Sequence, residues 1–109
     1  MTGKFLGKIT FAEYGTVKEY PFLIGLQLSF VLDGCSVSDG SKYTVNMGEE
    51  CSWNFAAEKT NAVTASIEKV YKILNDAKVN YVSQLIGKPV EVTIEENLFR
   101  SFRILTEVL

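Results

Sequence analysis

The stretch of residues 60–77 carries the strongest periodic pattern in the chain. Apolar residues recur there at steps of four, three, four and three, at Val63, Ile67, Val70, Leu74 and Ala77. This spacing lays an unbroken apolar stripe along one side of an α-helix, about 27 Å long, and charged residues fall largely on the other side. We predict that Thr60 or Asn61 caps the helix. Apolar surface from the flanking segments has to cover the stripe.

The segments on both sides of this helix alternate apolar and polar residues in the way typical of β-strands. We predict strands at residues 4–14, 22–32, 43–47, 51–55, 90–95 and 98–108. Gly7 interrupts the apolar face of the first strand, so we expect a bend or a close backbone contact there. Residues 33–42 hold two Asp-Gly pairs and three serines, and we interpret them as an exposed loop that serves as a lid. A short turn of helix is predicted at residues 81–86, ending at Gly87.

The last two predicted strands fit together as a hairpin. A three-residue turn at Glu96, Asn97 and Leu98 predicts the pairs Val90 with Ile104, Glu91 with Arg103, and Val92 with Phe102. In this register apolar residues face apolar residues, and an acid faces a base. The order of elements predicts one α+β domain over residues 1–109. Its sheet is mostly antiparallel, with about five strands, and one long helix packs on one face.

The balance of charge excludes several classes of protein. Eleven basic and thirteen acidic residues give a formal net charge of −2. No overall positive field would therefore draw the chain to nucleic acid or to an anionic membrane. No stretch approaches the roughly 20 apolar residues of a membrane span. We expect no generic nucleic-acid binding, no membrane insertion, and a protein that stays in the cytoplasm.

The chain contains no histidine. Histidine is the commonest general acid or base near neutral pH, the usual partner of a serine or cysteine nucleophile, and the commonest transition-metal ligand. Cys35 and Cys51 lack the CxxC spacing of a zinc or redox site, and we interpret both as reduced thiols. We therefore expect a protein that is not an enzyme and that has no metal and no cofactor.

Basic and aromatic residues near strand ends are the candidates for ligand binding. Arg100 and Arg103 lie on the last predicted strand, and two guanidinium groups on one face could grip a phosphate or a carboxylate. Pairing of Arg103 with Glu91 across the hairpin is the alternative, whereas the expected register leaves Arg100 without an acidic partner. Lys42 and Tyr43, at the exit of the predicted lid, could add a charge and a ring.

A second candidate is the approach to the predicted helix. Trp53 and Asn54 lead directly toward its start, where free N–H groups could hold an anion while Trp53 stacks on a base or ring. The alternative is that Trp53 belongs to the core and that Thr60 or Asn61 occupies those N–H groups. Both interpretations stay open on the sequence alone.

Three segments carry a resemblance to a known group of proteins. They are residues 7–9 (GKI), 85–92 (LIGKPVEV) and 103–109 (RILTEVL). In them the chain resembles small accessory proteins encoded by bacteriophages and prophages. The resemblance implies an accessory role in the cytoplasm of a bacterial host and carries over no site residue. Small phage proteins of this size and acidity often resemble inhibitors of bacterial immunity.

Three functional hypotheses follow. The first is a binding protein without turnover that inhibits bacterial immunity by sequestering a small anionic, nucleotide-derived signal. The second is a protein-protein inhibitor of a host defence effector, similar to anti-CRISPR proteins. The third is a structural or regulatory phage protein. Because the strands hold more apolar positions than one helix can cover, we also expect a homo-oligomer.

Overall fold

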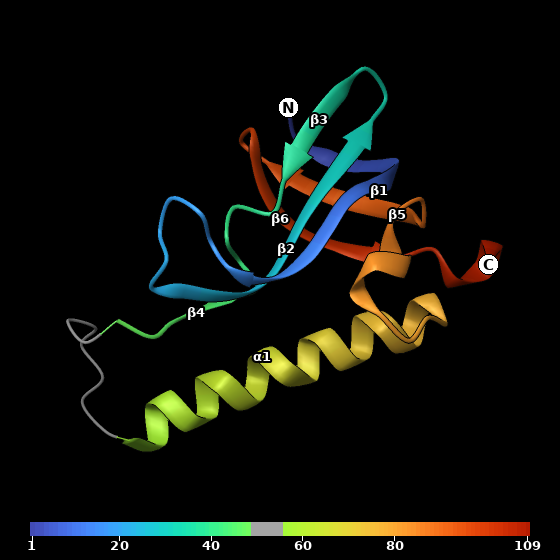
Figure 1. Ribbon diagram of the computed structural model, residues 1–109. Coiled ribbons are helices and arrows are strands. Elements are labelled where there is room, and N and C mark those ends of the chain that lie inside the picture. The colour runs from blue at the N-terminus through green and yellow to red at the C-terminus, as the bar shows by residue number, and fades with distance from the viewer. Residues whose placement is uncertain (49–55) are drawn as a thin grey trace.

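The computed structural model describes residues 1–48 and 56–109 (Figure 1). The elements are β1 (Gly3–Thr16), β2 (Leu23–Leu32), β3 (Cys35–Ser38), β4 (Thr44–Asn46), α1 (Ala56–Ala77), η1 (Val82–Leu85), β5 (Pro89–Glu95), β6 (Leu98–Ile104) and η2 (Thr106–Val108), where η marks a 3-10 helix. The strands form one six-stranded antiparallel sheet, and α1 is the one α-helix of the described residues. The predicted α+β class is confirmed.

The long strand β1 organises the sheet. The strand order is β3-β2-β1-β5-β6, and β4 pairs with β2 beside this path. β1 pairs with β2 from Gly7 to Thr16 and with β5 from Gly3 to Lys8. Its register with β2 shifts between Ile9 and Phe11. Such a bulge bends a strand and increases its twist, so β1 can pair with both β2 and β5 as the sheet curls.

The sheet curls until β2 and β6 face each other across the core. The ring of Phe30 in β2 lies with its centroid 5.4 Å from that of Phe99 and 5.0 Å from that of Phe102, both in β6. Two strands, β1 and β5, separate β2 from β6 in the strand order. Contact across this distance requires a partly open barrel rather than a flat layer. The sheet therefore buries much of its own inner face.

Gly7 makes the close backbone contact that the sequence predicts. A Cβ atom at this position would lie 2.3 Å from the carbonyl oxygen of Val31 and 2.7 Å from Cδ2 of Leu32. No side chain fits at that separation, so β1 and β2 approach closely only because position 7 is glycine. The bulge itself falls three residues later, at Thr10.

The predicted register of the closing hairpin is confirmed, but the predicted turn is wrong. Val90 pairs with Ile104, Glu91 with Arg103 and Val92 with Phe102. Glu95 pairs with Leu98, so the turn has two residues, Glu96 and Asn97, with φ angles of 53° and 66°. Positive φ at both positions is the turn that matches the twist of a two-stranded ribbon. The register shifts once more beyond Thr93, where Arg100 is the additional residue, and this bulge restores the expected pairs.

The helix α1 starts earlier and is covered less than the sequence predicts. It begins at Ala56, so Thr60 and Asn61 lie inside it and cannot be its caps. Ala56, Ala57, Glu58 and Lys59 are good helix formers, which explains the earlier start. Ala77 is fully buried and Leu74 half-buried, but Val63 and Ile67 are 38% and 54% exposed. The curled sheet covers its own core, and α1 crosses beneath it (Figure 1), so only the C-terminal half of the stripe is buried.

The segment predicted as a lid, residues 33–42, contains a short strand. Cys35–Ser38 forms β3 and pairs with residues 29–32 of β2, after a turn in which Gly34 has a φ of 78°. The Asp-Gly pair at 33–34 is therefore a hairpin turn rather than the start of a mobile loop. The short helix predicted near residues 81–86 is present as η1, and Gly87 follows it with a φ of 89°.

Two further expectations concern the remaining predicted strands. The last strand ends at Ile104, and η2 occupies Thr106–Val108 instead of a longer strand. The strand predicted at residues 51–55 lies outside the described residues. None of the described helices is long and apolar enough to cross a membrane.

Candidate functional site

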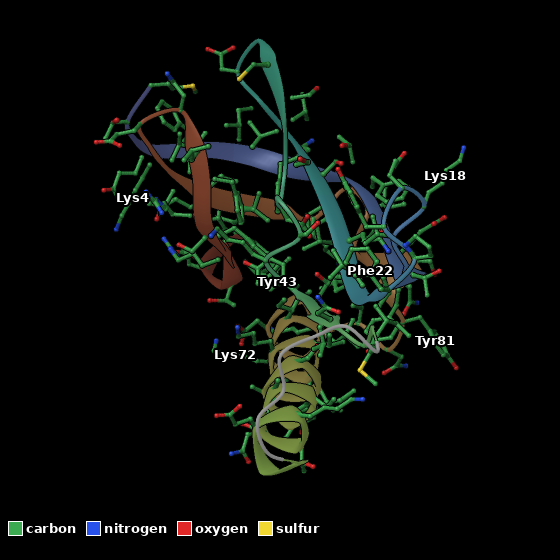
Figure 2. The ribbon with its side chains drawn as sticks, turned by 90° about the vertical axis from the view of Figure 1, so that its left-hand side faces the viewer. Lys4, Lys18, Phe22, Tyr43, Lys72 and Tyr81 are labelled. Atoms are coloured by element: carbon green, nitrogen blue, oxygen red, sulfur yellow. The ribbon has the colours of Figure 1, made fainter. Side chains whose placement is uncertain are left out.

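A groove between α1 and the sheet is the candidate site. It consists of two adjoining cavities that share Tyr43 and Lys69, and we call it the helix groove. The β4 lobe, about 330 Å³, is lined by residues 42–46 and by Ala62, Ala65, Ser66 and Lys69 of α1. The β6 lobe, about 210 Å³, is lined by Tyr43, Lys69, Lys72, Ile73, Asp76, Phe102, Arg103 and Ile104. Figure 2 shows Tyr43 where the sheet meets α1, with Lys72 nearby.

Small side chains on α1 explain why no side chain fills the β4 lobe. Ala62, Ala65 and Ser66 face residues 42–46 across the lobe, and none of them is long enough to fill the space. Among the described residues, the hydroxyl of Ser66 is buried without a hydrogen-bond partner. Buried hydroxyl groups are almost always paired. Ser66 thus combines a place in the lining of this lobe with an unused hydrogen-bonding group.

Tyr43 forms the floor that the two lobes share. Its ring lies edge-on to Phe102, at 5.8 Å between centroids, and to Phe99, at 6.3 Å. Its backbone carbonyl accepts a hydrogen bond from the N–H of Leu26 at 3.3 Å. Burial raises the pKa of Tyr43 to about 12, and the negative charge of Asp39 adds to this effect. At neutral pH the phenol is uncharged, so it offers hydrogen bonds and a ring but not a base.

The unpaired positive charges of the groove are those of Lys42, in the β4 lobe, and of Lys69, which lines both lobes. Within residues 1–48 and 56–109, neither Lys42 nor Lys69 has an ion-pair partner. In the β6 lobe, the ammonium of Lys72 lies 2.7 Å from Oδ2 of Asp76. Arg103 also lies there and is engaged by carboxylates. An anion would therefore be attracted mainly to the β4 lobe, between Lys42 and Lys69.

The interactions of Arg103 follow the alternative that the sequence left open. Its Nε donates to Oε1 of Glu91 at 3.2 Å, and its Nη1 donates to Oε1 of Glu107 at 3.1 Å. These hydrogen bonds raise the pKa of Arg103, and the guanidinium lowers the pKa of Glu107. Arg103 lines the groove, but the carboxylates of Glu91 and Glu107 already neutralise its charge.

Arg100 is not brought to the groove. Its Nε lies 3.6 Å from Oε2 of Glu95, so the expectation that it has no acidic partner is wrong. The two-residue turn and the bulge at Arg100, which the sequence did not indicate, place it beside Glu95. Of the other predicted site residues, Lys42 and Tyr43 line the groove, whereas Trp53 and Asn54 lie outside the described residues.

Sequence reasoning missed the helix side of the groove. The residues concerned are Ser66, Lys69 and Lys72. A signal for them exists in the sequence, because Ala62, Ala65, Ser66 and Lys69 follow helical spacing and form a face of small residues that ends in a cation. Such a face leaves room beside a helix. What it would lie against cannot be read from that spacing.

The described side chains of the groove suit the binding of an anion. The described lining residues offer ammonium groups, one neutral phenol and one unpaired hydroxyl, and the single carboxylate, Asp76, is paired with Lys72. No group of three or more residues able to hold a metal ion is found in the described part of the chain. The arrangement can hold an anionic group and pack a ring beside it.

Comparisons with protein-family models, with curated proteins and with solved structures gave no match.

Proposed function

We propose that this protein binds a small anionic ligand that carries a ring, such as a nucleotide, in the helix groove and does not convert it. One observation carries the proposal. The β4 lobe, about 330 Å³ in volume, combines two cations that lack carboxylate partners among the described residues, Lys42 and Lys69, with the buried unpaired hydroxyl of Ser66.

Each lining group has a distinct part in this proposal. Lys42 and Lys69 attract the anionic group, and Ser66 donates a hydrogen bond to one of its oxygens. Tyr43 holds the ring of the ligand against a surface that the core keeps in place, because its own ring packs on Phe99 and Phe102. The groove contains no described side chain suited to proton transfer near neutral pH, which supports binding without turnover.

The biological role we propose is sequestration. The resemblance of residues 7–9, 85–92 and 103–109 to small phage accessory proteins supports a setting in the cytoplasm of an infected bacterium. A protein that holds a nucleotide-derived signal of bacterial immunity without releasing a product would lower the free concentration of that signal. Retention, rather than catalysis, is what the lining residues favour.

Isothermal titration calorimetry with nucleoside monophosphates, cyclic dinucleotides and ADP-ribose tests the proposal. We expect at least one of these ligands to bind, and the Lys42→Gln/Lys69→Gln variant to bind it at least about tenfold more weakly, as loss of charge-assisted contacts predicts. Lys4→Gln/Lys18→Gln is the control matched in charge, since Lys4 and Lys18 line neither lobe and lie away from Lys72 (Figure 2). No heat with any ligand, or an equal loss in the control, would overturn the proposal.

A second candidate function, inhibition of a host defence protein by direct contact, is supported by the outer side of α1. Val63, Ile67 and Tyr71 follow one another at a spacing of four and are 38%, 54% and 68% exposed. An exposed apolar helix face of this kind is a common docking surface for proteins. Affinity capture from a host lysate tests it: Ile67→Asp should lose a stoichiometric partner and keep the nucleotide. A partner that Ile67→Asp retains would contradict this candidate.

A further inference from the structure

A second cavity, about 240 Å³, shares no lining residue with the helix groove, although its residues 39–41 directly precede Lys42 and Tyr43 of the groove. We call it the serine cleft. Phe11, Glu19, Gln27, Ser29, Ser38 and Asp39 are among the residues that line it. It is formed by β1, the β1–β2 connection, β2, the end of β3 and the residues that follow β3.

The register of three strands builds one wall of the serine cleft. Phe11 of β1 pairs with Ser29 of β2, and Ser29 pairs with Ser38 of β3. Directly opposite residues share one face of a sheet, and Ser29 alternates with Leu28 and Phe30, which point into the core. A ring and two hydroxyl groups are therefore aligned in a row on the outer face. Phe11 is 41% exposed there, although it is a large apolar residue.

The serine cleft carries negative charge, and its lining residues include no cation. Asp39 is only 5% exposed, and its carboxylate accepts hydrogen bonds from the N–H groups of Leu28 and Ser41, each at 3.1 Å. These donors are neutral, no lysine or arginine lines the cleft, and Asp39 has no ion pair among the described residues. Glu19 adds a second carboxylate at the exposed rim. Buried charges in proteins are normally paired.

We propose that the serine cleft binds an organic cation, an ammonium or guanidinium group carried on a short aliphatic stem. Asp39 and Glu19 oppose its charge, the hydroxyl groups of Ser29 and Ser38 accept its N–H hydrogen bonds, and the ring of Phe11 covers the stem or the cation itself. The source is either a free alkylamine or the side chain of a lysine or arginine on a partner.

The composition of the cleft selects this class of ligand. Two carboxylates repel the anionic ligands proposed for the helix groove, so the two sites are chemically opposite. A divalent metal ion usually takes six or more oxygen ligands, often from several carboxylates, and the described residues hold no such cluster. A cation with an apolar stem uses both the carboxylates and the exposed ring of Phe11.

Amide chemical shifts of the protein, residues 1–109, test the inference. Putrescine represents the free amine, and Nα-acetyl-lysine methylamide represents the side chain of a partner. We expect saturable shifts at the amides of Phe11, Ser29 and Ser38 with at least one of them, and the better ligand identifies the source. Glu19→Gln should weaken that binding about fivefold, the effect of one partly screened charge. The exposed carboxylate of Glu68 lies on α1, so Glu68→Gln is the control that should leave it unchanged.

Two results would overturn the inference. One is the absence of saturable shifts with both cations, and the other is an equal loss of binding in Glu19→Gln and Glu68→Gln. Phe11→Leu provides a second variant that keeps both carboxylates. It should weaken binding by a similar factor if the ring contacts the cation, and unchanged binding would exclude that contact. Nucleotide binding in the helix groove should be the same in all three variants, so failure here is distinguishable from failure there.

Discussion

The rings of Tyr43 and Phe102 meet at 87°, with their centroids 5.8 Å apart. Through this contact the floor of the helix groove is continuous with the aromatic core, because Phe102 in turn packs on Phe30 at 5.0 Å. Edge-to-face pairs of this kind fix the orientation of both rings. A ligand in the groove would therefore meet a surface that is already in place before it binds.

The buried phenol of Tyr43 predicts a loss of stability at alkaline pH. Its pKa is raised from 10.0 to about 12, first by burial and then by the charge of Asp39. Because the folded pKa lies above the unfolded one, the stability that this group contributes is fully present below pH 10.0 and is lost as the pH rises through about 12. Urea unfolding at a series of alkaline pH values measures it. Tyr43→Phe should show a smaller decline over this window, and an identical decline would contradict the assignment.

Removal of the Ser66 hydroxyl should separate stability from binding. The hydroxyl is buried without a partner among the described residues, so Ser66→Ala should leave the free energy of unfolding unchanged or raise it by about 1 kcal/mol. The same variant should bind the nucleotide more weakly, since it loses a donor. Chemical denaturation and calorimetry measure the two effects. A clear loss of stability would show that the hydroxyl has a structural partner and would count against its proposed role.

Close approach of β1 to β2 predicts that Gly7 cannot be replaced. In Gly7→Ala the new Cβ would lie 2.3 Å from a backbone oxygen of Val31, so the strands would have to separate. We expect a loss of at least about 2 kcal/mol in the free energy of unfolding. Gly15→Ala, in the same strand, is the control, because its Cβ would meet nothing within 4 Å. Similar stabilities for the two variants would refute the close contact.

Arg100 should be dispensable for binding. It pairs with Glu95 at 3.6 Å and does not line the helix groove. Arg100→Gln should therefore bind the nucleotide within about twofold of the unchanged protein, as expected for removal of an exposed ion pair outside the site. Calorimetry under the conditions used for Lys42→Gln/Lys69→Gln provides the comparison. A loss of affinity as large as that of the double variant would show that the ligand binds at the β5–β6 hairpin instead of the helix groove.

The exposed side of α1 predicts self-association. Val63, Ile67 and Tyr71 form an apolar surface on one side of α1. In the absence of another protein partner, we expect two or more copies to bury this surface together. Light scattering coupled to size-exclusion chromatography should give a mass above that of one chain, and Ile67→Asp should reduce it. Asn61→Asp, which adds the same charge at an exposed position on another side of α1, is the control. A mass equal to one chain would contradict this prediction.

Sequence patterns predicted the fold well where two strands are adjacent both in the chain and in the sheet. The alternation in residues 90–95 and 98–104 was enough to pair Glu91 with Arg103 correctly. The error in the turn was cancelled by the bulge at Arg100, since one residue fewer in the turn is offset by one residue more in the strand. The sequence contains no pattern that distinguishes these two solutions.

The position of α1 could not be predicted from its stripe. Periodicity shows which side of a helix is apolar, but it does not show how far a sheet will curl. Here the contact between Phe30 and Phe99 closes the sheet on itself. The sheet then buries its own inner face, so α1 does not have to pack on it along its whole length. The helix groove depends on the same tertiary event, because residues 42–46 reach Ala62 and Ser66 only when β4 pairs with β2 beside the curl.

The double pairing of β1 has a consequence for how the chain reaches this structure. Its first half is hydrogen-bonded to β5, which is made only after β2, β3, β4 and α1. Contacts so distant along the chain form late and slowly. Until they do, the inner faces of β1 and β2 stay open to water and to other chains, so the nascent protein depends on its final hairpin to escape aggregation.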